Sequence, residues 1–366
     1  MSTSILRPSR RAVLLGAGAL GASVALAAPA VRAQARRSIK FTLPWLAQGA
    51  TAYAYVAREA GMFRSRGLDV EISRGFGSVA AGQAIAQGQF DFGLVGAGPL
   101  ILTAARGLPL TGLATINYDM TMGIALRADS PIRTPKDLEG KRIGAVPASA
   151  EFPFWPAFAR KAGIDVSKVT IQQMDNRVLE RSLIDRQVDA ITAIGSSTIP
   201  VMQSQNAPHR FMLYSAAGIT FYANVVTTRA EVLQRDPGLC EAVTDALIEA
   251  TVLQLKEPDR ALDMFIKQVP EIGITQGGRE NARLSQGLMQ YTILAPEAIN
   301  NGLGWSDMAR WTEMTDLVME FGAPGDARRP AVEALISNRF AGKTKLSAAE
   351  WEALRGKLGD FAKMLG

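Results

Sequence analysis

Residues able to do covalent chemistry are scarce in this 366-residue chain. It holds a single cysteine, Cys240, and a single histidine, His209, so a Cys/His metal site and a thiol–imidazole pair built from other positions are excluded. Cys240 lies in an apolar stretch of helical period, which predicts a buried thiol. Ser196 and Ser197 lack the G-x-S-x-G elbow of a serine nucleophile, and His209 lies in an expected polar loop. These patterns argue against a hydrolase and against a metal site.

One glycine-rich segment could support nucleotide chemistry. Gly75-Phe76-Gly77-Ser78-Val79-Ala80 fits the G-x-G-x-x-A fingerprint, follows a strand-like run and opens a helical one. The dinucleotide fold also needs an acidic residue about 20 positions further on, at the tip of the next strand. Positions 94–104 carry no acid. An exported nucleotide-dependent oxidoreductase is therefore the alternative, and a protein without a cofactor is the main expectation.

The N-terminus has the pattern of an export signal. Arg10 and Arg11 precede an uncharged stretch from Ala12 to Ala28, and Ser9-Arg10-Arg11-Ala12-Val13-Leu14 resembles the twin-arginine signal for export of folded proteins. We interpret residues 1–35 as a twin-arginine-type signal peptide, cleaved after Ala33-Gln34-Ala35, which places the mature protein in the periplasm. A retained anchor is the alternative, although about 17 apolar residues are marginal for spanning a bilayer.

The charge of the mature body limits its partners. Residues 1–35 hold four Lys/Arg and no acid, so their removal lowers the formal net charge from +6 to about +2. A nearly balanced body without a Lys/Arg-rich run argues against nucleic acid as a partner. The length that remains, about 330 residues, predicts two domains.

Strand-like runs alternate with helical patterns along this body. Strands are predicted at 39–43, 68–72, 90–95 and 110–116, with helices at 52–63, 79–87 and 99–106 between them. The pattern then restarts, with strands at 141–146, 169–173 and 190–194, helices at 154–162 and 178–187, and mostly helix after residue 227. Such alternation predicts parallel strands and an α/β fold.

A short internal repeat favours two lobes of like topology. Gln89-Phe90-Asp91-Phe92 and Gln187-Val188-Asp189-Ala190 lie 98 residues apart, and each stands at a step from helix to strand. Four residues are a small sample, but two lobes built alike would produce this correspondence.

Three segments resemble motifs of one family of bacterial transport receptors. Residues 61–71 resemble G-x-F-x-x-x-G-L-D-V-E, residues 88–93 resemble G-x-x-D-F-G, and residues 130–144 resemble S-P-I-x-T-x-x-D-L-x-G-K-x-I-G. In their order and spacing, these segments are similar to the binding proteins of ABC importers for nitrate, sulfonates, taurine and thiamine pyrimidine precursors. The motifs span roughly residues 39–230. They are specific for the family and not for the ligand.

The resemblance implies an α/β, type II periplasmic-binding fold, in which two doubly wound lobes are joined by a two-strand hinge. Lobe 1 would be residues 39–127 plus 221–345, lobe 2 would be residues 128–220, and residues 346–366 would form a C-terminal helix. The crossing strands would lie near Ile124–Arg127 and Tyr222–Thr227, and the lobes would close on a solute by a hinge motion. The resemblance further implies a monomeric, non-enzymatic receptor whose partners are a small-molecule solute and an ABC permease in the inner membrane.

Ligands of open α/β sheets bind beyond the carboxyl ends of the strands, so the loops at these ends supply the candidate site. Small residues there let backbone N–H groups at helix N-termini approach a ligand. Ser78 could cap its helix or donate to a ligand oxygen. The candidate ligand-binding residues are Trp45, Gln48, Tyr53, Gly77, Ser78, Gly96, Ala97, Tyr118, Asp119, Phe152, Trp155, Asn176, Ser196, Tyr222 and Asn224.

The chemistry of these loops indicates a ligand class. Several aromatic faces with neutral amides suit a planar aromatic or heteroaromatic solute, such as a pyrimidine-like compound or an aromatic acid, and a sulfonate is the alternative. Asp119 and Glu151 are the charged candidates, and only Arg74 and Arg177 lie nearby as cations. For each aromatic residue, a place in the core competes with a place at the ligand.

Overall fold

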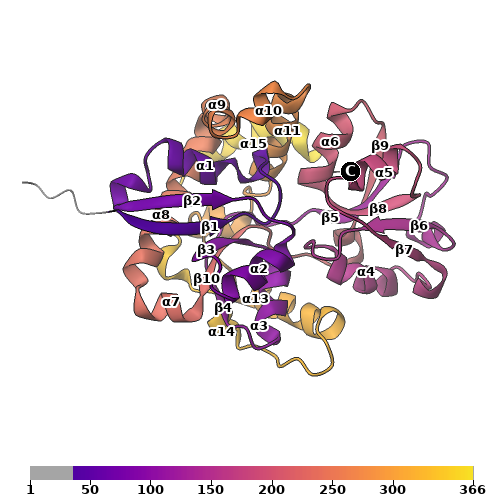
Figure 1. Ribbon diagram of the computed structural model, residues 1–366, viewed down its shortest axis with the longest axis horizontal. Coiled ribbons are helices and arrows are strands. Elements are labelled where there is room, and N and C mark those ends of the chain that lie inside the picture. Colours follow the sequence, from indigo (N-terminus) through magenta and orange to yellow (C-terminus); the bar gives the residue numbers. More distant parts are fainter. Residues whose placement is uncertain (1–35, 366) are drawn as a thin grey trace, which may run out of the picture. The chain divides into compact units, whose positions relative to one another are not determined.

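The computed structural model describes residues 36–365, so the expected signal peptide at residues 1–35 lies outside the described residues. Between residues 36 and 365, no helix combines the length and the apolar character needed to cross a bilayer. The alternating elements predicted from the sequence are present, and they form two mixed sheets covered by helices (Figure 1).

The first sheet has the strand order β2-β1-β3-β10-β4. Strands β2, β1 and β3 are parallel to one another, whereas β10 runs antiparallel between β3 and β4. All four residues of β3 are buried, as expected for a central strand with helices on both faces. The strands are β1 (Arg37–Thr42), β2 (Leu68–Ser73), β3 (Phe92–Val95), β4 (Leu110–Thr115) and β10 (Val225–Arg229).

The second sheet repeats this topology with the order β7-β6-β8-β5-β9. Strands β6, β7 and β8 are parallel, and β5 runs antiparallel between β8 and β9. In each sheet the antiparallel strand is therefore the one that arrives from the other lobe. The strands are β5 (Met122–Arg127), β6 (Arg142–Ala145), β7 (Thr170–Gln173), β8 (Ala190–Ile194) and β9 (His209–Leu213).

The internal repeat of the sequence has a structural counterpart. Asp91 and Asp189 stand just before β3 and β8, the central strands of the two sheets. The Oδ2 atom of Asp91 accepts a hydrogen bond from the backbone N of Lys40 in β1 at 2.9 Å. The Oδ2 atom of Asp189 accepts the same bond from Arg142 in β6, also at 2.9 Å. In both lobes the aspartate thus ties the start of one strand to its parallel neighbour.

The helices follow the strands in both lobes, and the chain after β10 is mostly helical, as predicted. Four of the later helices begin with a proline at their first position, where its missing N–H costs no hydrogen bond. The helices are α1 (Ala52–Glu59), α2 (Ser78–Ala86), α3 (Ala97–Ala105), α4 (Trp155–Lys161), α5 (Leu179–Ile184), α6 (Gly195–Ser204), α7 (Ala230–Arg235), α8 (Pro237–Lys256), α9 (Pro258–Gln268), α10 (Pro270–Ile274), α11 (Gly278–Tyr291), α12 (Pro296–Asn301), α13 (Met308–Leu317), α14 (Val332–Leu335) and α15 (Ala348–Ala362).

The structure moves the boundary between the lobes. Strand β5 pairs with β8 and β9, so Ile124–Arg127 belongs to the second sheet and is not a hinge strand of lobe 1. The two crossovers are instead residues 116–121 and 214–224, and Val225–Thr227 already lies in β10. Sequence patterns reveal a buried strand but not the sheet that it joins, which explains the misplaced boundary.

The crossovers run side by side. The backbone N of Ile116 donates to Asn224 O at 2.8 Å, and Ala223 N donates to Asn117 O at 2.9 Å. Met120 N donates to Phe221 O at 3.0 Å. These bonds join the crossovers into a two-stranded connection, which is the geometry of a hinge.

Cys240 and His209, the two residues considered for covalent or metal chemistry, both lie in regular secondary structure. Cys240 is fully buried in α8, as predicted, and burial raises the pKa of its thiol to about 12. His209 was expected in a loop but is the first residue of β9, an edge strand whose side chains are all half-buried. Neither residue contacts the cavity described below.

Candidate functional site

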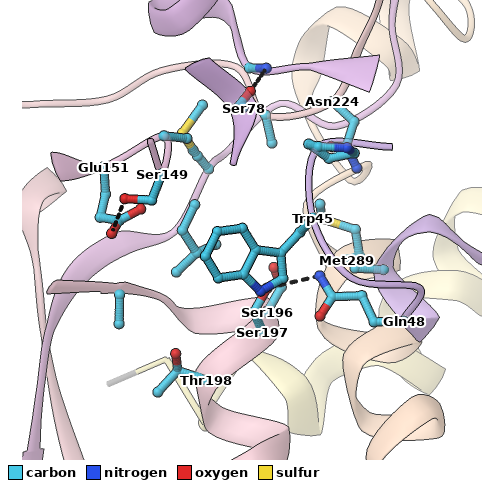
Figure 2. Close-up of a pocket in the computed structure, with 18 of the residues that line it drawn as sticks. Trp45, Gln48, Ser78, Ser149, Glu151, Ser196, Ser197, Thr198, Asn224 and Met289 are labelled. Carbon is cyan, nitrogen blue, oxygen red and sulfur yellow. Dashed lines mark hydrogen bonds between the residues drawn. The ribbon is translucent and has the colours of Figure 1, made fainter. Parts of the chain in front are cut away.

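A cavity of about 70 Å³ lies where the carboxyl ends of the parallel strands of both sheets meet (Figure 2). Its wall combines hydroxyl, amide and carboxyl groups with apolar side chains from both lobes. The lining residues are Pro44, Trp45, Gln48, Ala50, Thr51, Ser78, Gly96, Met120, Ser149, Ala150, Glu151, Leu179, Glu180, Ala193, Ile194, Ser196, Ser197, Thr198, Ala223, Asn224 and Met289.

Helix N-termini supply much of the polar wall. Ser78 is the first residue of α2, Glu180 is the second of α5, and Ser196 to Thr198 lie in the first turn of α6. The unpaired N–H groups of a first helical turn carry a partial positive charge. Gly77, and not Ser78, is the N-cap of α2, so the Ser78 hydroxyl does not cap its helix. Its Oγ accepts a bond from Gly96 N at 2.7 Å, which leaves its own proton able to donate into the cavity.

Two glutamates, the buried Glu151 and the half-buried Glu180, give the cavity its electrostatic character. The Oε1 atom of Glu151 accepts hydrogen bonds from Ser149 Oγ at 2.6 Å and from Thr192 Oγ1 at 3.0 Å. Thr198 Oγ1 donates to Oε1 of Glu180 at 2.8 Å. Burial raises the pKa of both carboxyl groups, and the neighbouring Glu180 raises that of Glu151 further.

No positive side chain balances these carboxyl groups. Lysine, arginine and histidine are all missing from the cavity wall formed by the described residues. An ionised carboxylate in such a place costs free energy unless a partner with hydrogen-bond donors or a positive charge meets it. The wall is therefore complementary to a solute that presents N–H groups.

Trp45 connects the two lobes across the cavity. It belongs to the loop after β1, and its indole lies in the middle of the lining residues (Figure 2). The same ring packs against the apolar cluster of the second lobe that includes Val146 and Leu179. Trp45 thus offers the cavity a flat apolar face and closes one side of it.

The lobes touch around the cavity, so the structure represents a closed cleft. Gln48 Nε2 donates to Ser197 Oγ at 2.9 Å, from lobe 1 to lobe 2. On another side, Val79 N donates to Ala148 O at 3.2 Å. Behind the cavity, Ser285 Oγ of α11 donates to the carbonyl of Ser196 in α6 at 2.9 Å.

The structure brings together six of the fifteen candidate residues in the cavity wall: Trp45, Gln48, Ser78, Gly96, Ser196 and Asn224. Gly77 lies at the contact between the lobes, Ala97 is buried at the start of α3, and Asn176 is buried beside α5. Asp119 lies in the first crossover, where its Oδ1 accepts a bond from Thr121 N at 2.8 Å and burial raises its pKa. The other candidates are aromatic.

Most of the aromatic candidates pack in the interior. Tyr53, Tyr118, Trp155 and Tyr222 are at most 4% exposed and belong to the hydrophobic core, and Phe152 is half-buried in a short helical turn. Helices that follow strands must cover the sheet, and aromatic residues serve that packing well. Trp45 is therefore the single aromatic ring among the lining residues.

Glu180 and Met289 are two of the lining residues that the sequence candidates did not include. Glu180 stands in the first turn of α5, the helix after β7. The search of the loops beyond the strand ends would have included Glu180 if it had been extended by one helical turn. Met289 comes from α11, which follows no strand. Its place at the cavity depends on the packing of α11 against lobe 2, and no local pattern encodes that packing.

The glycine-rich loop is used for contacts within the protein. Gly75 N donates to Trp45 O at 2.7 Å, and Gly77 N donates to Pro44 O at 3.0 Å. A Cβ atom on Gly75 would lie 2.1 Å from Leu43 O, and one on Gly77 would lie 1.9 Å from Ala148 O. The loop also follows β2, the edge strand of its sheet. Close backbone packing thus accounts for both glycines.

The contact at Gly77 leads to a test of lobe closure. We expect Gly77→Ala to weaken solute binding roughly tenfold, because the added methyl clashes with lobe 2 and the positive φ adds strain. Gly67→Ala is the matched control, since Gly67 has φ +73° with no atom within 4 Å of the added Cβ. Isothermal titration measures both. Equal affinities for the two variants would contradict the closed contact.

Two similar sheets, two crossovers and a cavity between the lobes define the periplasmic-binding-protein fold. The alkanesulfonate-binding protein SsuA of Xanthomonas axonopodis pv. citri, solved with MOPS bound, superposes with a TM-score of 0.63 at 14% identity and covers 82% of this chain and 98% of its own. The chain matches the NMT1/THI5 like family over residues 49–261, and the protein belongs to that family.

Two relatives that are similar in sequence have names that state a ligand. The riboflavin-binding protein RibY of Chloroflexus aurantiacus is 22% identical over 330 residues, which cover 87% of this chain and 90% of the relative. The formylaminopyrimidine-binding protein of Halalkalibacterium halodurans is 22% identical over 240 residues, 65% of this chain and 72% of the relative. All of these similar proteins are binding proteins.

Proposed function

We propose that this protein is the solute-binding receptor of an ABC importer and holds a small organic solute between its two lobes. The observation that carries the proposal is the cavity itself, because both lobes build its wall and two crossovers connect them. A solute that touches both lobes binds the closed form better than the open form and so drives closure. A membrane permease can then distinguish loaded from empty receptor by shape.

The location and partners follow from this role. The receptor works in the periplasm after export through the twin-arginine-type signal at residues 1–35, acts as a monomer, and delivers solute to a permease in the inner membrane. The similarity to periplasmic binding proteins supports this placement.

Binding without catalysis fits the chemistry of the wall. The serine and threonine hydroxyls at the cavity have no histidine, cysteine or lysine beside them among the lining residues, so the bases that usually activate such nucleophiles are missing there. The hydroxyls of Ser149 and Thr198 donate to the buried side of the glutamate carboxyl groups, an arrangement that also holds a carboxyl group in place for a ligand. The N–H groups of Gly75 and Gly77 are engaged with the loop after β1 and do not form a cradle for a pyrophosphate. Both points favour a receptor over the exported oxidoreductase.

The wall favours a nitrogen heterocycle as the solute. A ring with an amino substituent next to a ring nitrogen can pair with both oxygens of a carboxyl group, and its face can lie on the Trp45 indole. A sulfonate or nitrate would face Glu151 and Glu180 without any cation in the wall. The names of the two bacterial relatives, which refer to riboflavin and to an aminopyrimidine, point to the same class.

The cavity in this structure is smaller than the space that a ring solute needs. A dry cavity that accepts benzene in another protein measures about 150 Å³. The space here is about 70 Å³. A ring solute therefore requires the Trp45 indole to swing aside or the lobes to part slightly, which the hinge permits.

The test identifies the solute directly. We expect protein purified from its native host to release a nitrogen heterocycle on denaturation, detected by mass spectrometry, and aminopyrimidines to raise the melting temperature in a thermal-shift panel. The panel also contains aromatic carboxylates, aromatic sulfonates, alkanesulfonates, taurine, nitrate, NAD, NADP and flavins. Stabilisation by taurine or nitrate alone would refute the ligand class, and saturable binding of NAD or NADP would refute the receptor.

A further inference from the structure

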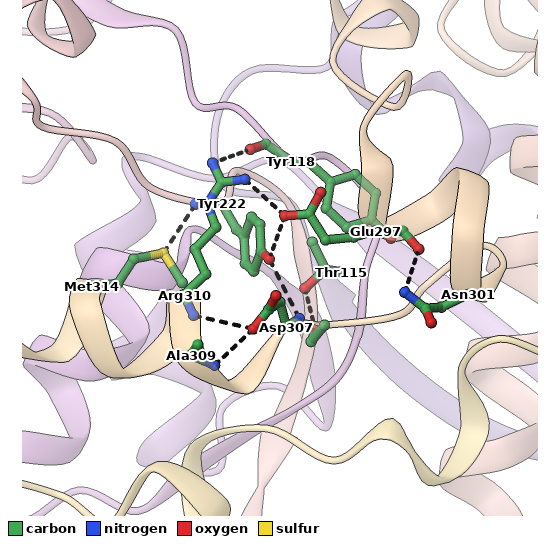
Figure 3. A network of polar contacts seen from close by, with 10 residues as sticks. Thr115, Tyr118, Tyr222, Glu297, Asn301, Asp307, Ala309, Arg310 and Met314 are labelled. Atoms are coloured by element: carbon green, nitrogen blue, oxygen red, sulfur yellow. Dashed lines mark hydrogen bonds and ion pairs between the residues drawn. The ribbon is translucent and has the colours of Figure 1, made fainter.

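One partly buried ion pair lies next to both crossovers. Arg310 of α13 and Glu297 of α12 pair at 2.9 Å between Nη1 and Oε1, with side chains 27% and 11% exposed. Both residues come from the helical part of lobe 1 that follows the second crossover in sequence (Figure 3).

The ion pair binds one residue of each crossover. Arg310 Nη2 donates to the carbonyl of Tyr118, in the first crossover, at 2.8 Å. The Tyr222 hydroxyl, in the second crossover, donates to Glu297 Oε1 at 2.8 Å. The two tyrosine rings meet edge to face, with centroids 5.4 Å apart. Figure 3 shows the four residues in one network.

The chemistry of arginine suits this arrangement. One nitrogen of the planar Arg310 guanidinium donates to Glu297, and another donates to the Tyr118 carbonyl. The guanidinium carbon lies 4.4 Å from the centre of the Tyr222 ring. A lysine ammonium is a point charge and cannot span these partners in the same geometry. Tyr222 makes a second contact with α13, because its backbone N donates to Met314 Sδ at 3.3 Å.

The network continues into the cavity wall. Met120 stands two residues after Tyr118, and Asn224 two residues after Tyr222, and both line the cavity. Asn224 Nδ2 donates to Asn117 Oδ1 at 3.1 Å. A change in the path of either crossover therefore moves part of the site as well as the second lobe.

We infer that Arg310 and Glu297 are positioning residues, which hold both crossovers in the path required by the closed cleft and thereby set the affinity for solute. This inference rests on the proposed function for its link to affinity. Its link to lobe closure can be tested without any ligand, and the two tests can fail separately.

The ligand-free test uses small-angle scattering of the full chain. We expect Arg310→Met to increase the radius of gyration, because the crossovers lose their common anchor and the lobes separate more often. Tyr222→Phe keeps the ring and removes the hydroxyl, so we expect a smaller increase. The matched control is Arg279→Met, which removes an exposed pair with Asp263 in the same lobe and should leave the radius unchanged. An Arg310→Met radius equal to that of wild type would overturn the inference.

The second test uses the solute found in the panel described above. We expect Arg310→Met to weaken binding roughly tenfold, within the usual range of coupling between sites, and to do so mainly through faster dissociation. Arg310→Lys keeps the charge but should not restore the affinity. Lower thermal stability with unchanged affinity and unchanged radius would show a merely structural ion pair and overturn the inference. If wild type binds no solute, the proposed function fails while the scattering result still decides the role in closure.

Discussion

Replacing Glu180 by glutamine is expected to weaken solute binding by about two orders of magnitude. Glutamine keeps the shape of the side chain and can still accept the bond from Thr198, but it removes the negative charge that faces the solute's N–H groups. Truncating one partner of a buried, hydrogen-bonded charge pair costs roughly 2–5 kcal/mol, and every 1.4 kcal/mol is about tenfold in affinity. Titration calorimetry with the best solute measures the effect.

Glu151→Gln is expected to act in the same direction, since Glu151 belongs to the same wall and the nearby Glu180 raises the pKa of its carboxyl group. Glu313→Gln, at an exposed site on α13, is the matched control and should bind as wild type does. Full affinity in both cavity variants would refute the view that these carboxyl groups select the solute.

The same substitutions should stabilise the unliganded protein at neutral pH. Burial raises the pKa of Glu151 and Glu180 above the ordinary value of a glutamate side chain. A raised pKa means that the folded state binds the carboxyl proton more tightly than the unfolded state does, so protonation stabilises the folded wild-type protein. This contribution to the free energy of unfolding is complete below the unfolded pKa and is lost as pH rises through the folded pKa. Thermal unfolding should therefore favour the glutamine variants at pH 8 and show little difference near pH 4. Lower stability of both variants at pH 8 would contradict this account.

A gain in stability together with a loss of binding would identify the carboxyl groups as functional. Structural ion pairs behave in the opposite way, because the loss of one partner leaves the other buried and uncompensated. The cavity wall has no such partner among its described residues.

The architecture was predictable because its signals are local and repeated. Alternation of strands and helices predicted the two α/β lobes, and the repeat around Asp91 and Asp189 corresponds to matching hydrogen bonds to Lys40 and Arg142. The lobe boundary was less accessible. Strand β5 has the buried pattern of any central strand, and its membership of the second sheet depends on pairing with β8 and β9.

The candidate site was predictable where one rule decides it, namely that ligands bind beyond strand ends. That rule located Trp45, Ser78 and Ser196, which the structure brings to one cavity. It could not separate aromatic residues that face the cavity from those that face the sheet, because both kinds stand in the same loops. Met289 also escaped it, since α11 reaches the cavity only through packing against the other lobe.

Trp155 and Trp45 provide the clearest test of that distinction. Trp155→Ala is expected to destabilise the protein by about 3–5 kcal/mol, the usual cost of removing a large aromatic side chain from a core. The ring is 4% exposed and packs against Phe158, with centroids 6.1 Å apart. Urea unfolding followed by circular dichroism measures the loss, and the affinity of the folded fraction should change little.

Trp45→Ala is expected to show the reverse pattern. Its indole is half-buried at the cavity, so the substitution removes a stacking face worth about 0.5–1.5 kcal/mol beyond the buried area, and affinity should fall about tenfold. Because the ring also packs against the apolar cluster of lobe 2, some stability is lost, but less than at Trp155. Trp45→Phe should recover part of the affinity, since a smaller flat face remains. A Trp155→Ala variant that folds stably and fails to bind, beside a Trp45→Ala variant with full affinity, would place the solute against lobe 2 near α4 and away from this cavity.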